Sequence, residues 1–65
     1  MPIIQIQLLE GRSDKQIREI ISSVTNAVVE TAHVPAENVR IIVTEIAHSH
    51  WGVAGKTKAE TTNNH

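Results

Sequence analysis

The chain has 65 residues, a formal net charge of −1 and no cysteine. Without cysteine it can form neither a disulfide nor a thiolate zinc site, and its few scattered Lys and Arg residues give no reason to expect a nucleic-acid partner. A single domain of this length buries only about 60 % of the surface of its unfolded chain, so we expect association with further copies to stabilise it.

The sequence has no apolar run of roughly 20 residues, and it does not open with a basic segment followed by an apolar one. No membrane partner is expected, and a soluble cytoplasmic protein is the default expectation. With one Trp and neither Phe nor Tyr, the core has to be built from Ile, Val, Leu and Ala.

The first residue of interest is Pro2, which directly follows Met1. If Met1 is removed, Pro2 carries a free secondary amine, which is both a base and a nucleophile. The reference pKa of an α-amino group, roughly 7.7–8.0, lies close enough to neutrality for the surroundings to tune it. The simpler alternative is that a small residue at position 2 only permits methionine removal. Pro2 is therefore a candidate general base whose support must come from the rest of the chain.

Residues 3–9 alternate well enough to predict a β-strand. One face, formed by Ile4, Ile6 and Leu8, is wholly apolar, whereas the other face is mixed. A mixed face suits a surface that something other than the chain's own helix partly covers. Gly11 then allows a turn, since glycine adopts a positive φ without strain.

A helix is predicted at about residues 14–32. Ser13 can cap the amide of Gln16 while the Gln16 side chain reaches back, and Asp14 complements the positive end of the helix dipole. Pro35 disfavours helical geometry at the residue before it, so the helix should end by His33. The apolar positions share one helical face and are Ile17, Ile20, Ile21, Val24, Ala27, Val28 and Ala32.

Residues 39–46 form a second apolar run, rich in β-branched side chains, which predicts another strand. Both of its faces carry large aliphatic side chains, so both need cover. A strand, a helix and a strand form a right-handed β-α-β unit with parallel strands. Two strands are not a stable sheet in water, so we expect an α/β protomer whose four-stranded sheet is completed by dimerisation.

The next segment, residues 47–56, contains the only aromatic residue, Trp51, between two histidines and two glycines. It predicts a turn or a short hairpin. Residues 57–65 are polar and lack periodicity, so a disordered tail is expected there. The predicted domain therefore covers residues 1–56.

Four residues form a candidate constellation for chemistry: Pro2, Arg12, Arg40 and Trp51. Such a set suits small carboxylated keto or enol substrates, because Arg binds carboxylates in a bidentate manner and stabilises a developing enolate oxygen. Apolar surroundings and nearby cations would both lower the pKa of a proline amine. Each residue also has a simpler interpretation: the arginines could face solvent or form ion pairs, and Trp51 could belong to the core or to an interface.

A metal site at His48 and His50 is a weaker hypothesis. Two imidazoles spaced two apart on an extended segment would point to one side, but no third ligand is defined. We therefore expect no metal and no other cofactor.

Several stretches together resemble the 4-oxalocrotonate tautomerase family. They are Pro2-Ile3, Leu8-Leu9-Glu10-Gly11-Arg12-Ser13, Val39-Arg40-Ile41-Ile42-Val43-Thr44-Glu45 and His50-Trp51-Gly52-Val53-Ala54-Gly55. The resemblance extends to about residue 56. It implies a β-α-β protomer with a short C-terminal hairpin, and a homo-oligomer that is at least a dimer and usually a hexamer built as a trimer of dimers.

The resemblance also implies a function. The mature chain would begin at Pro2, whose amine would move a proton between oxygen and carbon of a 2-hydroxydienoate or 2-oxo acid such as 2-hydroxymuconate, a compound of aromatic degradation. Arg12 would bind the remote carboxylate, and Arg40 would hold and polarise the carbonyl end. These residues would come from different subunits, and Trp51 would form the hydrophobic wall.

Three departures from the family's pattern concern the substrate more than the fold. Trp51 stands where phenylalanine is usual, Ala54 replaces a glycine, and His48-Ser49 replaces lysine-glycine. Two alternatives stay open: a related proline-dependent dehalogenase or decarboxylase, and a non-catalytic homo-oligomeric scaffold. No extra carboxylate is placed to activate water, so an isomerase that performs tautomerisation is the leading hypothesis.

Overall fold

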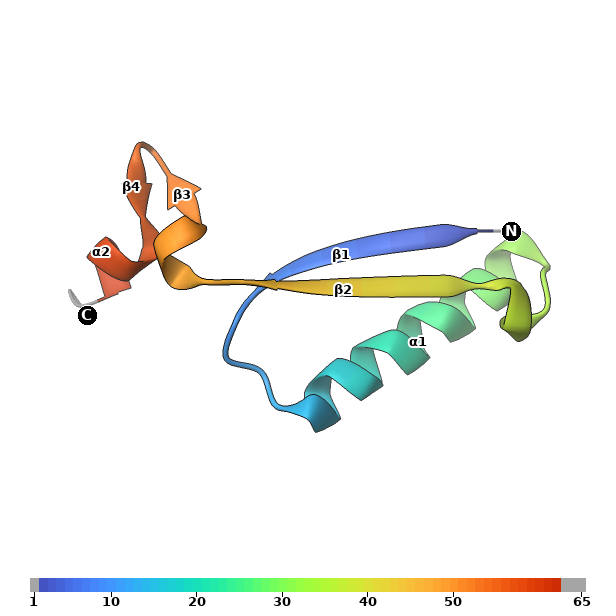
Figure 1. Ribbon diagram of the computed structural model, residues 1–65. Helices are drawn as coiled ribbons and strands as arrows, with labels where there is room; N and C mark the ends of the chain where they lie inside the picture. Colours follow the sequence, from blue (N-terminus) through green and yellow to red (C-terminus); the bar gives the residue numbers. More distant parts are fainter. Residues whose placement is uncertain (1, 63–65) are drawn as a thin grey trace.

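The computed structural model describes residues 2–62, which form a long β-α-β unit followed by a small C-terminal module (Figure 1). The elements in chain order are β1 (Ile3–Leu9), α1 (Asp14–Ala32), the 3₁₀ helix η1 (Ala36–Asn38), β2 (Arg40–Ile46), the 3₁₀ helix η2 (His48–His50), β3 (Gly52–Val53), β4 (Lys56–Thr57) and α2 (Lys58–Thr62). Both predicted strands and the predicted helix are confirmed; β2 begins one residue later than expected.

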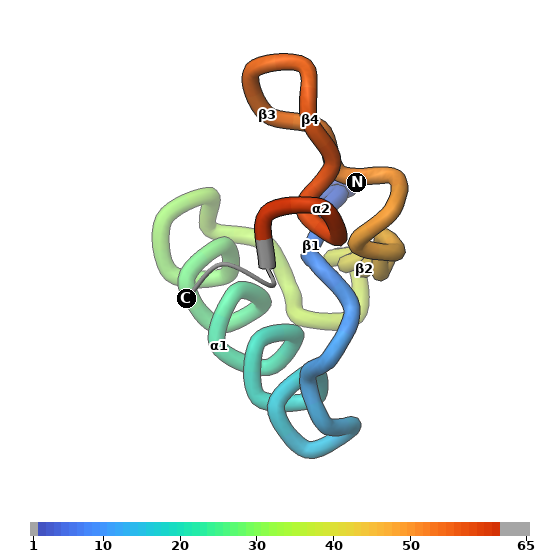
Figure 2. Tube along the Cα trace, turned by 90° about the vertical axis from the view of Figure 1, so that its left-hand side faces the viewer, coloured from blue at the N-terminus to red at the C-terminus, as the bar shows by residue number. Residues whose placement is uncertain are grey.

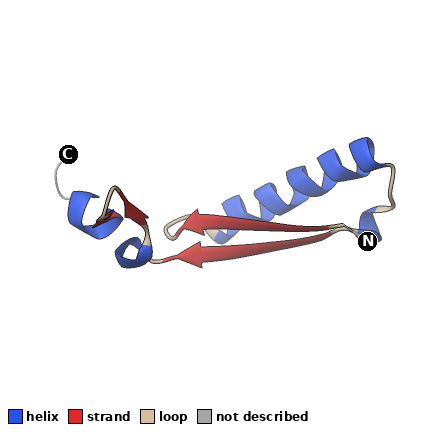
Figure 3. Ribbon diagram, turned by 90° about the horizontal axis from the view of Figure 1, so that it is seen from above, coloured by secondary structure: helices blue, strands red, loops and turns tan. Residues whose placement is uncertain are grey.

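Strands β1 and β2 are parallel and in register from the pair Ile3 and Arg40 to the pair Leu9 and Ile46. Helix α1 runs back alongside them, which returns the chain to the end of the sheet where β1 begins (Figure 3). The β-α-β prediction is therefore confirmed. Because the strands are parallel, their N-terminal ends meet at one end of the molecule and their C-terminal ends meet at the other.

The limits of α1 follow from local signals. The Ser13 hydroxyl accepts a hydrogen bond from the Gln16 amide (3.2 Å), and the Gln16 side chain accepts one from the Ser13 amide (3.1 Å). This reciprocal capping box is the predicted one. The helix ends at Ala32, and His33 takes a left-handed conformation (φ 57°) as its C-cap. The helix is thus fixed at both ends by its own sequence.

The protomer lacks a closed core. Along β1 and β2, the side chains on the helix side are half-buried except that of Glu45, whereas most of those on the other side are exposed. Val39 is the one buried hydrophobic residue among residues 2–62, and α1 contributes none. Ile3 is 61 % and Ile42 is 48 % exposed on the uncovered face of the sheet. This face is mixed, as predicted, and its exposed aliphatic side chains favour contact with another protomer.

The C-terminal module extends beyond the ends of the strands (Figure 1), and its β3–β4 hairpin projects away from α1 (Figure 2). Its hairpin joins β3 to β4 through Ala54 and Gly55, both at positive φ (54° and 82°). Such a two-residue loop favours Asn-Gly, so Ala54 is a strained choice. The whole molecule measures 44 × 24 × 15 Å with a radius of gyration of 15.1 Å, whereas a compact chain of this length has about 11 Å. The module therefore reaches out rather than folding back.

The expectation of a disordered tail is wrong for its first residues. Thr57 belongs to β4 and residues 58–62 form α2. Thr57 and Glu60 cap each other: the Thr57 amide and hydroxyl donate to the Glu60 carboxylate, and the Glu60 amide donates to the Thr57 hydroxyl. These hydrogen bonds lower the pKa of Glu60 below its usual value. The domain boundary at residue 56 stays a prediction, and residues 63–65 lie outside the described part.

Within residues 2–62, neither helix is long and apolar enough to cross a membrane.

The uncovered sheet face yields a testable prediction about assembly. Ile42→Asp should shift the protein toward smaller species in sedimentation velocity, because burying an aliphatic side chain contributes about 1.5–3 kcal/mol and an unpaired carboxylate cannot replace it. Ser22→Asp, at an exposed position of α1, is the matched control and should leave assembly unchanged. A folded wild-type monomer at micromolar concentration would contradict the prediction.

Candidate active site

Pro2 lies directly before β1 and is half-buried. Its carbonyl oxygen accepts a hydrogen bond from the Arg40 amide (3.0 Å). This bond continues the pairing of the strands past Ile3, so it fixes the backbone of Pro2 next to the start of β2. The predicted base and one predicted arginine therefore lie at the same end of the sheet.

The side chain of Arg40 is exposed and bends toward the turn that precedes β2. Its Nη1 donates a hydrogen bond to the carbonyl oxygen of Glu37 (2.6 Å), a residue of the 3₁₀ helix η1 that leads into the strand. This contact is not the ion pair that the simpler interpretation suggested, because the acceptor is a backbone carbonyl and not the carboxylate of Glu37 or Glu45. Because the acceptor is a neutral carbonyl, the guanidinium keeps its charge and its remaining donors for an anionic ligand.

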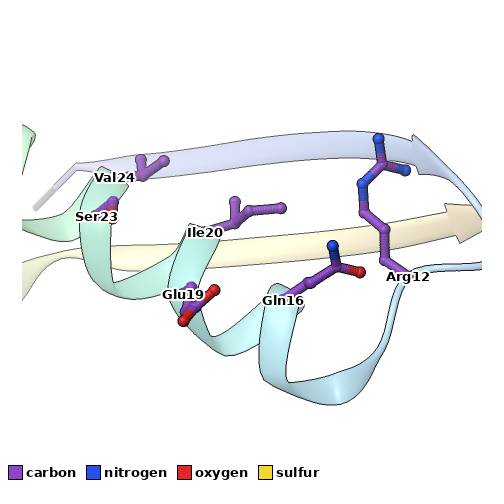
Figure 4. A pocket seen from close by; sticks show the side chains of 6 residues that line it. All are labelled: Arg12, Gln16, Glu19, Ile20, Ser23 and Val24. Carbon is purple, nitrogen blue, oxygen red and sulfur yellow. The ribbon is translucent and has the colours of Figure 1, made fainter.

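Arg12 lies at the opposite end of the sheet, after the turn at Gly11 (φ 124°). Its Nη1 donates to the carbonyl oxygen of Leu9 (3.2 Å), and the side chain is exposed. Figure 4 shows it standing beside the tip of β1, above the start of α1. It borders a shallow groove whose other lining residues all belong to α1: Gln16, Glu19, Ile20, Ser23 and Val24.

Trp51 follows η2 and is half-buried. Its amide donates to the carbonyl oxygen of His48 (3.4 Å), and its carbonyl oxygen accepts from the Lys58 amide (2.7 Å). The second bond ties the residue to the first turn of α2, which was not expected to exist. The indole is therefore carried by the C-terminal module, at the same end of the sheet as Arg12.

The four predicted residues thus separate into two pairs within one protomer. Pro2 and Arg40 lie where the strands begin, and Arg12 and Trp51 lie beyond where they end. A strand of seven residues spans about 20 Å, which is too far for a small acid to touch both pairs. One protomer therefore holds two halves of the predicted site rather than the site itself.

The histidine pair takes a different form from the expected one. His48 and His50 lie in the 3₁₀ turn η2, not on an extended segment, so their side chains do not share a side by alternation. In the described part of the chain, no three His, Asp or Glu side chains are grouped as metal ligands would be. His48 instead contacts Glu10 across the end of the sheet, with 3.6 Å between Nδ1 and Oε2. Sequence reasoning missed this contact, because the two residues are far apart in the chain.

Comparison with known proteins places this architecture in a family. The family model described as "Tautomerase enzyme" matches residues 2–61. A Staphylococcus saprophyticus protein named "Probable tautomerase" is 45 % identical over 60 residues, which cover 92 % of this chain and 98 % of that protein.

Two solved structures are similar in fold as well as in sequence. One belongs to the 4-oxalocrotonate tautomerase isozymes of Methylibium petroleiphilum: TM-score 0.94, 42 % identity, 98 % of this chain and 100 % of that chain. The other is a heterohexameric 4-oxalocrotonate tautomerase from Chloroflexus aurantiacus: TM-score 0.88, 37 % identity, 92 % of this chain and 97 % of that chain.

The β-α-β unit, the match over residues 2–61 and the identity to named tautomerases agree with one another. The chain belongs to the tautomerase family, as an isomerase of the 4-oxalocrotonate tautomerase type.

Proposed function

We propose that the protein interconverts the enol and keto forms of a small carboxylated acid, such as 2-hydroxymuconate, with the Pro2 amine as general base. The observation that carries this proposal is the hydrogen bond between the Arg40 amide and the Pro2 carbonyl (3.0 Å). It holds the backbone of the candidate base beside the backbone of Arg40, at the end of the sheet where both strands begin. Removal of Met1, which frees the amine, is part of the proposal.

In this reaction the unprotonated amine takes the proton from the 2-hydroxyl group of the dienol. The resulting ammonium then returns a proton to a carbon of the conjugated system, the double bonds shift, and the ketone forms. No electrons are gained or lost, and the amine is regenerated. Negative charge develops on the oxygen during this transfer, and a guanidinium there stabilises it. We assign that role to Arg40, whose guanidinium donates to a backbone carbonyl and not to a carboxylate.

The amine must be unprotonated near neutral pH for this chemistry. A nearby guanidinium and an apolar wall both disfavour the ammonium form, so both lower the pKa of the amine. Trp51 is the proposed wall, since its indole excludes water from one side of the pocket. The rate, followed as kcat/KM, then rises with pH through an ionisation that lies below that of an ordinary α-amino group, about 7.7–8.0.

Arg12 and Trp51 reach the Pro2 amine only if they come from another subunit. The exposed Ile3 and Ile42 on the uncovered face of β1 and β2 support association of protomers, and a relative from Chloroflexus aurantiacus is a heterohexamer. We therefore propose a homo-oligomer, at least a dimer and in its full form a hexamer, with each site shared between subunits. Arg12 binds the carboxylate that is remote from the reacting oxygen.

Sharing between subunits predicts complementation. Pro2→Ala and Arg12→Ala should each lower the turnover of 2-hydroxymuconate, but mixing the two by denaturation and refolding should restore activity. Under random mixing about a quarter of the sites receive Pro2 from one variant and Arg12 from the other. Refolding each variant alone is the control. Mixed oligomers, verified by mass, that recover nothing would place the residues of one site in a single protomer.

The two arginines should also separate in kinetics. Arg40→Ala should lower kcat by on the order of 100-fold, because polarising the oxygen matters most in the transition state. Arg12→Ala should chiefly raise KM for 2-hydroxymuconate, a diacid, and should affect phenylenolpyruvate, a monoacid, much less. An ultraviolet assay of ketonisation measures both. Arg18→Ala, at an exposed position of α1, is the matched control. Equal and small effects of the two substitutions on both acids would contradict the assigned roles.

A further inference from the structure

The segment that carries Arg12 and the segment that carries Trp51 meet at one side-chain contact. His48 Nδ1 lies 3.6 Å from Glu10 Oε2. Glu10 precedes Arg12 by two residues, and His48 precedes Trp51 by three. The contact therefore connects the backbone stretches that present the guanidinium and the indole.

This contact lies where the segment that follows β1 and the segment that follows β2 diverge. The Glu10 amide still donates to the Ile46 carbonyl (2.9 Å), which extends the strand pairing by one residue. After this bond, Gly11 turns the first segment toward α1, and Ala47 leads the second segment into η2. Beyond that point, among the residues that the structure describes, no strand pairing joins the two segments. A side-chain pair at the fork is thus well placed to set the angle between the turn and the C-terminal module.

We infer that Glu10 and His48 are positioning residues that hold Trp51 in a fixed relation to Arg12, and that protonation of His48 tightens this hold. The inference deepens the proposed function and rests on it, since the substrate is what needs Arg12 and Trp51 at a fixed separation. A carboxylate attracts an imidazolium but has no ionic attraction to a neutral imidazole. The side chains of His48 and Glu10 are 37 % and 55 % exposed, so protons reach both from solvent.

The other charged groups on the packed elements do not provide the same switch. Lys56 in β4 and Lys58 in α2 carry amines, and the reference pKa of a lysine amine, about 10.4, lies far above neutral pH. The Glu60 carboxylate is held by Thr57, and its pKa is lowered by those hydrogen bonds, so it stays ionised in mild acid. On the sheet side, Arg12 carries a guanidinium and Glu45 a carboxylate, and the reference pKa values of these two kinds of group lie outside the range of about pH 5.5–8.

One further imidazole lies close to Trp51, namely that of His50. An imidazole is the side chain whose ordinary change of charge falls between about pH 5 and 8. Any test must therefore separate the effect of His48 from that of His50, and this separation defines the control variant.

The test uses the fluorescence of Trp51, the only tryptophan in the chain. In the full-length protein without substrate, the emission should change between about pH 8 and pH 5.5, with a midpoint in the imidazole range. His48→Gln and Glu10→Gln should each abolish most of this change. His50→Gln should retain it. His48→Lys carries a permanent cation, so its emission should stay near the low-pH form at every pH.

Kinetics give the second readout. At about pH 7.5, His48→Lys should bind 2-hydroxymuconate more tightly than His48→Gln, with a KM lower by about twofold to fivefold, as expected for an exposed ion pair. Their kcat values should differ less than their KM values, because neither residue touches the reacting atoms. KM for phenylenolpyruvate should differ less, since a monoacid does not need Arg12.

The outcomes are distinct. A pH-dependent emission that survives in His48→Gln, or one that disappears in His50→Gln, would overturn the inference. So would equal KM values for His48→Lys and His48→Gln in an active enzyme. A wild-type protein that turns over neither acid would instead refute the proposed function. In that case the fluorescence series would still show whether Glu10 and His48 set the position of Trp51.

Discussion

The structure depends above all on one constraint: a single helix can cover only one face of the two-stranded sheet. Helix α1 shields one face of β1 and β2, and the opposite face leaves Ile3 and Ile42 largely in water. At about 25 cal/mol per Å² of apolar surface, this exposure favours association with another protomer. The extended shape, 44 × 24 × 15 Å, follows from the same fact, because little in a single protomer draws the C-terminal module back onto the sheet.

Parallel pairing then determines where chemistry can occur. In a parallel pair, residues at the start of both strands meet, and residues after their ends meet at the far side. Pro2 is hydrogen-bonded to Arg40 at one end, whereas Glu10 is hydrogen-bonded to Ile46 at the other, close to Arg12. The candidate site residues of one protomer therefore lie in two groups about 20 Å apart. Under the proposed function, the oligomer that covers Ile3 and Ile42 also brings these two groups together, so stability and catalysis share one requirement.

The parts of the fold with strong local signals could be predicted from sequence. Ser13 and Gln16 predicted the start of α1, alternation predicted β1, and a short run of β-branched residues predicted β2. A turn was also predicted within residues 47–56, but its 3₁₀ form η2 and the helix α2 were not, because segments of three and five residues carry no periodicity; Thr57 and Glu60 cap each other only once the chain has turned. The contact of Glu10 with His48 depends on the register of two distant segments. The roles of Arg12, Arg40 and Trp51 came from chemistry and family resemblance, and the separation of these residues within one protomer emerged only from the structure.

The central claim is that a free Pro2 amine is the base, and the most direct measurement compares two preparations of the same chain. One retains Met1 and the other has lost it, and intact mass verifies that each is free of the other. A retained Met1 converts the Pro2 nitrogen into a tertiary amide that accepts no proton at neutral pH. Ketonisation of 2-hydroxymuconate should therefore occur with the processed chain and be absent with the unprocessed one, at equal oligomeric state by sedimentation. Equal rates in both preparations would contradict the account.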